Sequence, residues 1–336
     1  MRHRSIFAAI LAASTLCTAP ALAASFDCTK ASKPSEKLIC AAPDLSKADI
    51  ALAREYTRLQ DALPASLKPV LQKGQRSWII YATLNCSSDG RGTISKTTDF
   101  SQCLLQEYER RLAALSQQPR QIGPFRVMQA DEFQAMPSSS KDPDFFPIVS
   151  HVKSVARVYG DNEAQAARVN QWLGGLAANA NASWNDPDTS ASFSLTLTAA
   201  NDVFASASVE TDVFAVGAAH PLALTKMVHL VMATGKALTW RDMFQPQARA
   251  KLTSLAWTAL KKKLGPDLMI EKQSELAKLV EDPGHWYFTA QGLRLQFNVY
   301  EVAAYVMGPQ EITLPWPMLK GSLSTLGETI ADAARE

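Results

Sequence analysis

All five cysteines lie in the first third of the chain, and the placement of the four that follow Cys17 limits the fold more than any other feature. They are Cys28, Cys40, Cys86 and Cys103, and no cysteine follows them. An even number of cysteines in an exported chain indicates two disulfides. Pairing between neighbours in the sequence is the simplest of three connectivities. A disulfide that closes the loop from Cys86 to Cys103 would add about 3 kcal/mol to the free energy of unfolding. The spacings include no Cys-x-x-Cys pair, which disfavours zinc.

The N-terminus has the order of a secretory signal peptide. Basic residues precede an apolar run over 6–16, and small residues at alternate positions end at Ala23. The run is too short to span a bilayer as a helix. Cys17 follows a leucine, where a lipid-anchor signal requires a small residue. We therefore expect residues 1–23 to be a signal peptide, cleaved after Ala23 or Ala24.

The remaining sequence favours a soluble protein of the periplasm or outside the cell. No later segment is apolar enough to predict a transmembrane anchor. Loss of the two arginines in the signal peptide would leave 32 (34 − 2) Lys/Arg against 32 Asp/Glu, and this neutral balance argues against nucleic acid as a partner. Residues 24–118 are mildly basic, with 13 Lys/Arg and 10 Asp/Glu, whereas residues 119–336 are mildly acidic, with 19 and 22.

Residues 24–118 predict a small helical domain stapled by the disulfides. Apolar residues recur at helical spacing in several segments, each with one stripe that must pack against the others. Ser46 and Asp49 fit a pattern for capping a helix N-terminus. The polar stretch 119–123 contains a proline and is interpreted as a linker.

The pattern after the linker predicts an α+β domain over 124–320 with a mostly antiparallel sheet. Alternating apolar residues indicate strands around 193–197, 203–209, 222–230 and 293–299, and helices are expected near 161–174 and 246–264. Runs of strands around a few helices are typical of this class. Residues 321–336 are set apart as a C-terminal tail. The fold class is therefore multidomain, a disulfide-stapled all-α domain followed by an α+β domain.

The sequence contains no motif that predicts catalysis, a metal or a cofactor. The histidines are dispersed, and no nucleophile elbow, phosphate loop or dinucleotide fingerprint occurs. One group of residues still suggests a site. Glu301 lies among apolar residues just after a predicted strand, and a carboxylate there needs a partner or solvent. His220, Tyr300 or Tyr305 could supply that partner. The four residues form either a structural hydrogen-bond cluster or a ligand-binding groove.

The first part of the chain resembles the LprI-like family of lysozyme-inhibitor domains. The resemblance covers about a quarter of the chain. It rests on Cys28, Glu36, Lys37, Ile39, Cys40, Leu45, Tyr56, Gln75, Arg76, Trp78, Cys86, Cys103, Leu104, Tyr108 and residues 110–112. An arginine commonly found shortly after the tryptophan is replaced here by Ala82.

The second part resembles the RsiV-like module that lies outside the membrane in some anti-sigma factors and beside some polysaccharide deacetylases. The matching segments are 217–221, 234–236, 240–244, 288–289, 292–297, 300–305, 308–309 and 311–315. The proline usual in the tyrosine segment is Ala304 here. In the anti-sigma factors the module is a lysozyme receptor. No membrane helix or sigma-binding tail is evident here, so the resemblance does not imply transmembrane signalling.

Both resemblances imply a binding protein rather than an enzyme. We expect a periplasmic protein that binds or inhibits lysozyme-like muramidases or senses a cell-wall component. The alternative is an enzyme or accessory factor that acts on cell-wall glycan, which would need a carboxylate pair or a metal set. A purely structural envelope protein is the third class. A lysozyme activity assay separates the first class from the others, and an assay of glycan turnover tests the second.

Overall fold

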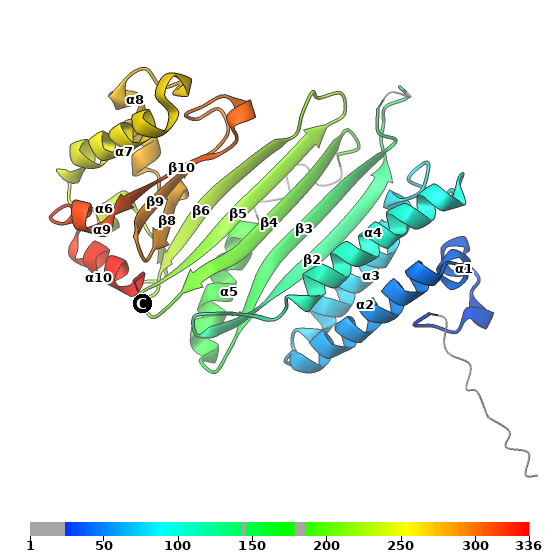
Figure 1. The fold of residues 1–336 in the computed structure, drawn as a ribbon. Helices are drawn as coiled ribbons and strands as arrows, with labels where there is room; N and C mark the ends of the chain where they lie inside the picture. Colours follow the sequence, from blue (N-terminus) through cyan, green and yellow to red (C-terminus); the bar gives the residue numbers. More distant parts are fainter. Residues whose placement is uncertain (1–23, 143–144, 179–185, 336) are drawn as a thin grey trace, which may run out of the picture.

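The protein has three parts, which are a helical region at the N-terminus, a long central sheet and a C-terminal lobe (Figure 1). The computed structural model describes residues 24–142, 145–178 and 186–335. The predicted signal peptide, residues 1–23, lies outside the described residues. The expected fold class is confirmed, because a helical region with two disulfides precedes a mixed, mostly antiparallel sheet with helices.

The helical region is stapled by two disulfides. Its elements are η1 (Cys28–Lys30), α1 (Pro34–Ala41), α2 (Pro43–Ala62), α3 (Lys68–Asn85) and α4 (Thr97–Ser116). Cys28 pairs with Cys40, and Cys86 pairs with Cys103, so the pairing between neighbours is confirmed. The first disulfide holds η1 against α1, and the second closes the loop between α3 and α4.

Helix α2 begins earlier than the capping pattern indicates. Proline at its first position, Pro43, has the fixed φ that favours a helix start. Ser46 therefore lies inside the helix, where its hydroxyl donates to the carbonyl of Ile39 at 2.6 Å. Asp49 is also inside the helix and nearly buried. The interpretation of these two side chains as caps is wrong, and Asp49 is free for another role.

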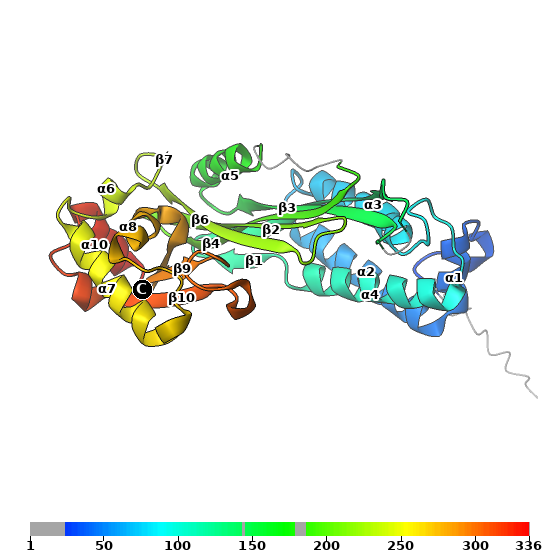
Figure 2. The same cartoon turned by 90° about the horizontal axis from the view of Figure 1, so that it is seen from above.

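The central sheet consists of seven strands in sequence order. They are β1 (Arg120–Ile122), β2 (Phe125–Pro137), β3 (Ile148–Tyr159), β4 (Thr189–Ala200), β5 (Phe204–Ala215), β6 (Leu222–Val231) and β7 (Lys236–Ala237). Strands β3 and β4 are parallel, and the other neighbouring pairs are antiparallel. The crossover between β3 and β4 carries α5 (Glu163–Ala178), which covers one face of the sheet over Phe193, Leu195 and Leu197 (Figure 2).

The helical region packs along the outer edge of β2, and α3 makes most of these contacts (Figures 1 and 2). A single apolar core joins Trp78 and Leu104 of the helices with Met128 and Ala135 of β2. Helix α3 approaches so closely that a Cβ added at Gly74 would lie 2.9 Å from the carbonyl oxygen of a β2 residue. The helical region and the sheet therefore share one core.

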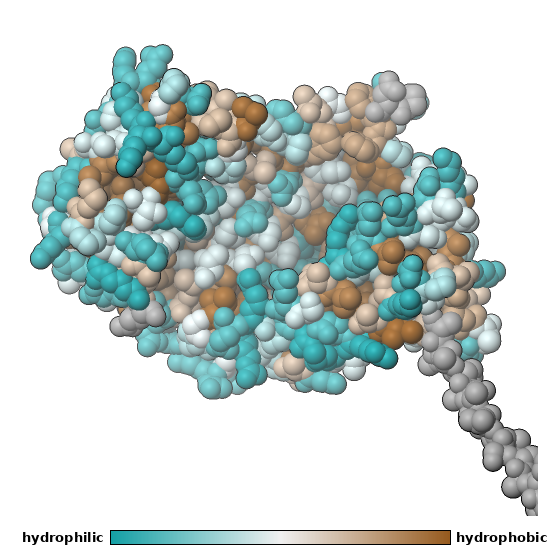
Figure 3. All heavy atoms as spheres, in the orientation of Figure 1, coloured by the Kyte–Doolittle hydropathy of each residue, from teal (hydrophilic) through white to brown (hydrophobic). Residues whose placement is uncertain are grey.

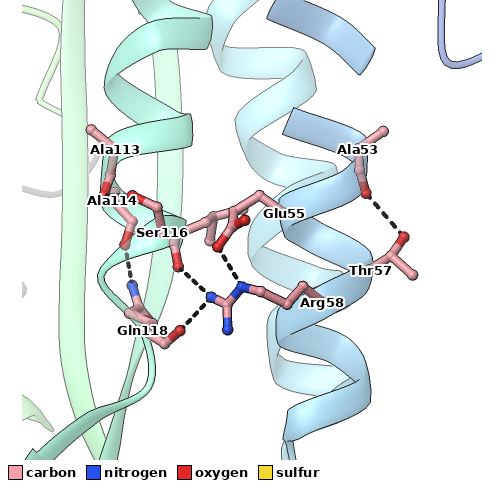
Figure 4. A network of polar contacts seen from close by, with 9 residues as sticks. Ala53, Glu55, Thr57, Arg58, Ala113, Ala114, Ser116 and Gln118 are labelled. Carbon is pink, nitrogen blue, oxygen red and sulfur yellow. Dashed lines mark hydrogen bonds and ion pairs between the residues drawn. The ribbon is translucent and has the colours of Figure 1, made fainter. Parts of the chain in front are cut away.

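Residues 119–123, expected to be a linker, include strand β1, and side-chain contacts hold the turn that precedes it. Residue Arg58 of α2 holds the preceding turn in place (Figure 4). Its guanidinium donates to the carbonyl of Gln118 at 2.6 Å and contacts Glu55 at 2.5 Å. The side-chain amide of Gln118 donates in turn to the carbonyl of Ala114 at 3.0 Å. These contacts fix the direction in which the chain passes from α4 to β1.

The C-terminal lobe follows β7 and has its own core. Its elements are α6 (Trp240–Met243), α7 (Ala248–Leu264), η2 (Gly265–Asp267), α8 (Gln273–Glu281), η3 (Pro283–His285), β8 (Trp286–Thr289), β9 (Gly292–Phe297), η4 (Tyr305–Met307), β10 (Gln310–Pro315), α9 (Trp316–Leu319) and α10 (Thr325–Ala333). Strands β8 to β10 form a second, antiparallel sheet. Residues 321–336, set apart as a tail, include α10, whose Ile330 and Ala331 are buried in this core.

Candidate binding surface

The segment after β9 runs along the free edge of β6 and places the tyrosines that the sequence singles out. The side-chain amide of Asn298 accepts from the backbone N–H of Thr225 at 2.8 Å and donates to its carbonyl at 3.1 Å. One amide therefore pairs with both main-chain groups of an edge residue, as a neighbouring strand would. This contact fixes the tyrosine segment beside the start of β6.

Three of the four predicted residues meet in an exposed aromatic cluster. The ring of His220 stacks on Tyr305 with centroids 3.9 Å apart. Tyr300 lies 5.6 Å from Tyr305, and its hydroxyl is 3.4 Å from Nε2 of His220. The Tyr305 hydroxyl donates to the carbonyl of Pro221 at 2.9 Å. The cluster therefore joins the loop before β6 to the segment after β9.

Glu301, the fourth predicted residue, contacts a different partner. Its Oε2 lies 3.0 Å from Nε2 of His285 and accepts from the backbone N–H of Asn298 at 2.7 Å. Burial raises the pKa of this carboxyl, but the hydrogen bond to His285 and the other contacts lower it more, so the pKa lies below its ordinary value. Sequence reasoning missed His285, because it comes from the separate segment η3.

The backbone at Tyr300 is strained. Its φ is +68°, in the left-handed region that bulky residues rarely adopt, and 52% of its surface is exposed. The turn is held by hydrogen bonds from the Tyr300 N–H to the carbonyl of Ala303 and from the Glu301 N–H to the carbonyl of Asn298. Strain in an exposed residue is more often kept for a function than for packing, which supports a binding role for the ring.

Exposed apolar side chains continue the aromatic cluster. Val306 is 88% exposed and Met307 is 43% exposed, and both directly follow Tyr305 in the chain. Figure 3 shows brown atoms on the loop after β9. We call the residues His220, Tyr300, Tyr305, Val306 and Met307 the tip surface. Apolar surface of this kind, rimmed by polar residues, is typical of protein contacts.

The sheet face beside the tip surface is lined with hydroxyl groups and acids. Figure 3 shows it as a pale area between the helical region and the C-terminal lobe. Ser208 donates to Glu210 at 2.9 Å, and Ser192 donates to Asp212 at 3.0 Å. Both acids are exposed, and both lie opposite residues of β6 in the register. The tip surface is thus bordered by negative charge.

The described residues add little that favours chemistry at this surface. Residues 24–142, 145–178 and 186–335 contain no group of three or more His, Cys, Asp or Glu side chains placed to hold a metal ion. Within the same ranges no helix has the length and apolarity needed to cross a membrane. What the arrangement offers is a strained, aromatic and apolar contact area next to two carboxylates.

Two family models match separate parts of the chain. The model described as "Lysozyme inhibitor LprI" matches residues 28–115, which include both disulfides. The model described as "Protein of unknown function (DUF3298)" matches residues 241–317, within the C-terminal lobe. No curated protein matches the chain.

Two solved structures show similarity to the chain. A DUF3298 family member from Bacteroides fragilis NCTC 9343 is 14% identical with a TM-score of 0.46, and the similarity covers 63% of this chain and 97% of that one. A DUF3298 family protein from Pseudomonas aeruginosa PAO1 is 15% identical with a TM-score of 0.42, and the similarity covers 60% of this chain and 96% of that one.

Proposed function

Because the chain joins an LprI domain to a DUF3298 domain, which is the RsiV-like family, we propose that it is an exported protein that binds lysozyme-like muramidases. The observation that carries the proposal is the match of the whole disulfide-stapled region to a family described as lysozyme inhibitors. Two disulfides fit an oxidising compartment outside the cytoplasm, in keeping with removal of residues 1–23 on export.

The tip surface is the contact area that we assign to the partner. Its aromatic rings and exposed Val306 supply apolar area, and Glu210 and Asp212 supply charge opposite to that of a cationic lysozyme. Residues 119–336 carry 19 Lys/Arg and 22 Asp/Glu, so the part that bears the tip surface is net acidic. Charge of this kind mainly accelerates association and is screened by salt.

The proposal is tested by titrating lysozyme onto the whole processed protein at low and high salt. We expect binding whose association rate falls as salt rises, and inhibition of lysozyme activity at saturation. Val306→Asp should weaken binding at least tenfold. Met318→Asp is the matched control, because Met318 is an exposed apolar residue of the same lobe that lies on α9, away from the tip surface.

Two outcomes would contradict this assignment. If Val306→Asp and Met318→Asp bind lysozyme equally well, the tip surface is not part of the interface. The muramidase proposal itself would then still stand. No binding by the unaltered protein would reject the muramidase proposal itself. A cell-wall glycan would then be the better candidate, and the hydroxyl-lined sheet face with Ser192 and Ser208 would be the place to test it.

A further inference from the structure

A buried acid of α2 lies where the processed chain is expected to begin. Asp49 is 8% exposed. One of its oxygens accepts from the backbone N–H of Ser25 at 2.6 Å, and the other accepts from the hydroxyl of Tyr108 at 3.2 Å. Signal-peptide cleavage is expected after Ala23 or Ala24. The backbone nitrogen that contacts the acid is therefore at, or next to, the N-terminus of the processed protein.

The side chains around Asp49 do not supply its counter-ion. It lines a pocket of about 640 Å³ in the helical region, together with Lys30 and Lys33. These lysines have other partners, since Lys30 lies 3.6 Å from Asp27 and Lys33 lies 3.8 Å from Glu36. In the part of the chain that the structure describes, no lysine, arginine or histidine side chain forms an ion pair with Asp49. A carboxylate buried in this way is stabilised more by a cation than by neutral donors alone.

Cleavage changes the charge of the donor. In the uncut chain the nitrogen of Ser25 is a neutral peptide N–H. Cleavage after Ala24 turns the same atom into an α-ammonium group, which is mostly charged at pH 7. A charge-assisted hydrogen bond of this kind is roughly twice as strong as a neutral one. Cleavage after Ala23 puts the ammonium group on Ala24, which is fully buried beside Ser25.

The segment that follows holds the new end in place. Phe26 packs against the core of the helical region, and the side chain of Asp27 caps η1. The disulfide between Cys28 and Cys40 fixes η1 on α1. The amine is therefore delivered to Asp49 by a chain that is already ordered, and little conformational entropy is lost when the two groups pair.

We propose that Asp49 is a binding site for the α-ammonium group that signal-peptide cleavage creates, and that this ion pair completes the helical region. Tyr108 holds the second oxygen of the carboxylate, so that both oxygens have a donor. The uncut precursor has only neutral donors at Asp49, and the helical region reaches its full stability after the precursor is cut. The inference rests on the export that the proposed function includes, and not on the muramidase partner.

The test compares whole proteins with defined first residues, each released from a cleavable fusion that leaves no extra residue. Two of them begin at Ser25 and at Ala24, and the third begins at Leu22, so that its ammonium group lies away from Asp49. We expect at least one of the two short proteins to melt at least about 5 °C above the third. The more stable one identifies the residue that carries the bound ammonium group.

A substitution separates the charge from the packing of the extra residues. With Asp49→Asn in all three proteins, the advantage of the short ends should fall to less than about 1 °C. The matched control is Asp44→Asn, which removes an exposed carboxylate from the same helix and should leave the advantage intact. An equal Tm for all three unsubstituted proteins, or an advantage that survives Asp49→Asn, would overturn the inference.

The reactivity of the amine gives a second readout that needs no substitution. A paired ammonium group keeps its proton and is a poor nucleophile. Acylation of the α-amine by an activated ester at pH 7, followed by mass spectrometry, should be at least tenfold slower in the folded protein than in a peptide of residues 25–30. Equal rates would show that the amine is free in solvent, which contradicts the ion pair.

The inference and the proposed function can fail separately. If the exported protein is cut after Ala23 or Ala24 but its amine is free, the ion pair is wrong and the export stands. If the exported protein retains residues 1–23, no such ammonium group exists, and the inference fails together with the expected processing. Titration of lysozyme tests the muramidase partner in either case.

Discussion

The helical region meets the central sheet through a buried ion pair, whereas the C-terminal lobe meets it through aromatic rings, hydrogen bonds and an exposed ion pair between Lys226 and Asp282. Arg111 of α4 lies 2.5 Å from Asp131 of β2, and their side chains are 3% and 9% exposed. At the other end, Phe204 of β5 packs on Phe288 with centroids 5.2 Å apart, and His229 of β6 contacts the carbonyl of Pro283 at 3.2 Å.

The two contacts should therefore respond differently to mutation and to a change in pH. The ion pair is satisfied on all sides, because Asp131 also accepts from Ser154 at 2.8 Å and Arg111 also donates to Gln75 at 3.2 Å. Removal of one partner leaves a buried charge. At the aromatic joint the ion pair is exposed, since the side chains of Lys226 and Asp282 are 63% and 44% exposed. Burial lowers the pKa of His229 to about 4, so that joint is sensitive to acid.

The largest expected effect is at the ion pair. Arg111→Ala should lower the free energy of unfolding by about 3–5 kcal/mol, because it leaves the carboxylate of Asp131 buried and without its cation. Urea denaturation measures the change. Lys47→Ala is the control, since Lys47 pairs with Asp44 on the surface and its loss should change stability by less than about 0.5 kcal/mol. Similar values for the two variants would contradict the comparison.

Acid should weaken the aromatic joint in a defined range. The pKa of His229 is lowered from 6.5 to about 4, so the unfolded chain binds more protons between these values. Stability is therefore full above about pH 6.5 and falls as the pH decreases towards 4, by up to about 3 kcal/mol. His229→Gln, which cannot titrate, should lose less stability than the unaltered protein over this range. If the two proteins lose the same stability between pH 6.5 and 4, the loss does not come from His229.

Loss of the second disulfide should affect the helical region selectively. Replacing Cys86 and Cys103 by serine opens a loop with a sequence separation of 17 and should lower stability by about 3 kcal/mol. Hydrogen exchange should show faster opening of α3 and α4, with smaller changes in β9 and α7, which lie in a separate core. Uniform acceleration in all these elements would show that the three parts open as one unit.

The smallest effect is expected at the strained turn. Tyr300→Gly should raise the Tm or leave it unchanged, because glycine adopts a φ of +68° without strain that amounts to roughly 1 kcal/mol. The same change removes a ring of the tip surface and should weaken partner binding. A clear fall in the Tm together with unaltered binding would indicate that the ring is needed for packing and not for a partner.

Local patterns in the sequence predict the long helices, the fold class and the disulfide pairing, but not the helices α8 and α10 or the two strands β2 and β3. Their burial does not alternate cleanly, because β2 contacts α3 along its outer edge while it also borders the core under α5. A period of two is visible only where one face is buried and the other is wet. The strand β4, with alternating Phe193, Leu195 and Leu197, meets that condition and was predictable.

The candidate site, too, could be predicted only in part from the sequence. The sequence offers His220 and the two tyrosines only as possible partners of Glu301, whereas the contact of Glu301 with His285 depends on how separate segments fold together. Asp49 fits a cap in the sequence, since an acid near a predicted helix start has that role by default. Only the position of Pro43 moves the helix start and places the carboxylate in a cavity.

The pairing of Asn298 with Thr225 also bears on self-association. Strand β6 pairs with β5 along its length but with β7 only at Leu230 and Val231, so most of its outer edge could accept a strand from another molecule. Such edges template aggregation unless they are covered. One amide side chain occupies the main-chain groups at the middle of this edge. The side chain of Asn298 thereby opposes edge-to-edge polymerisation of the protein at this strand.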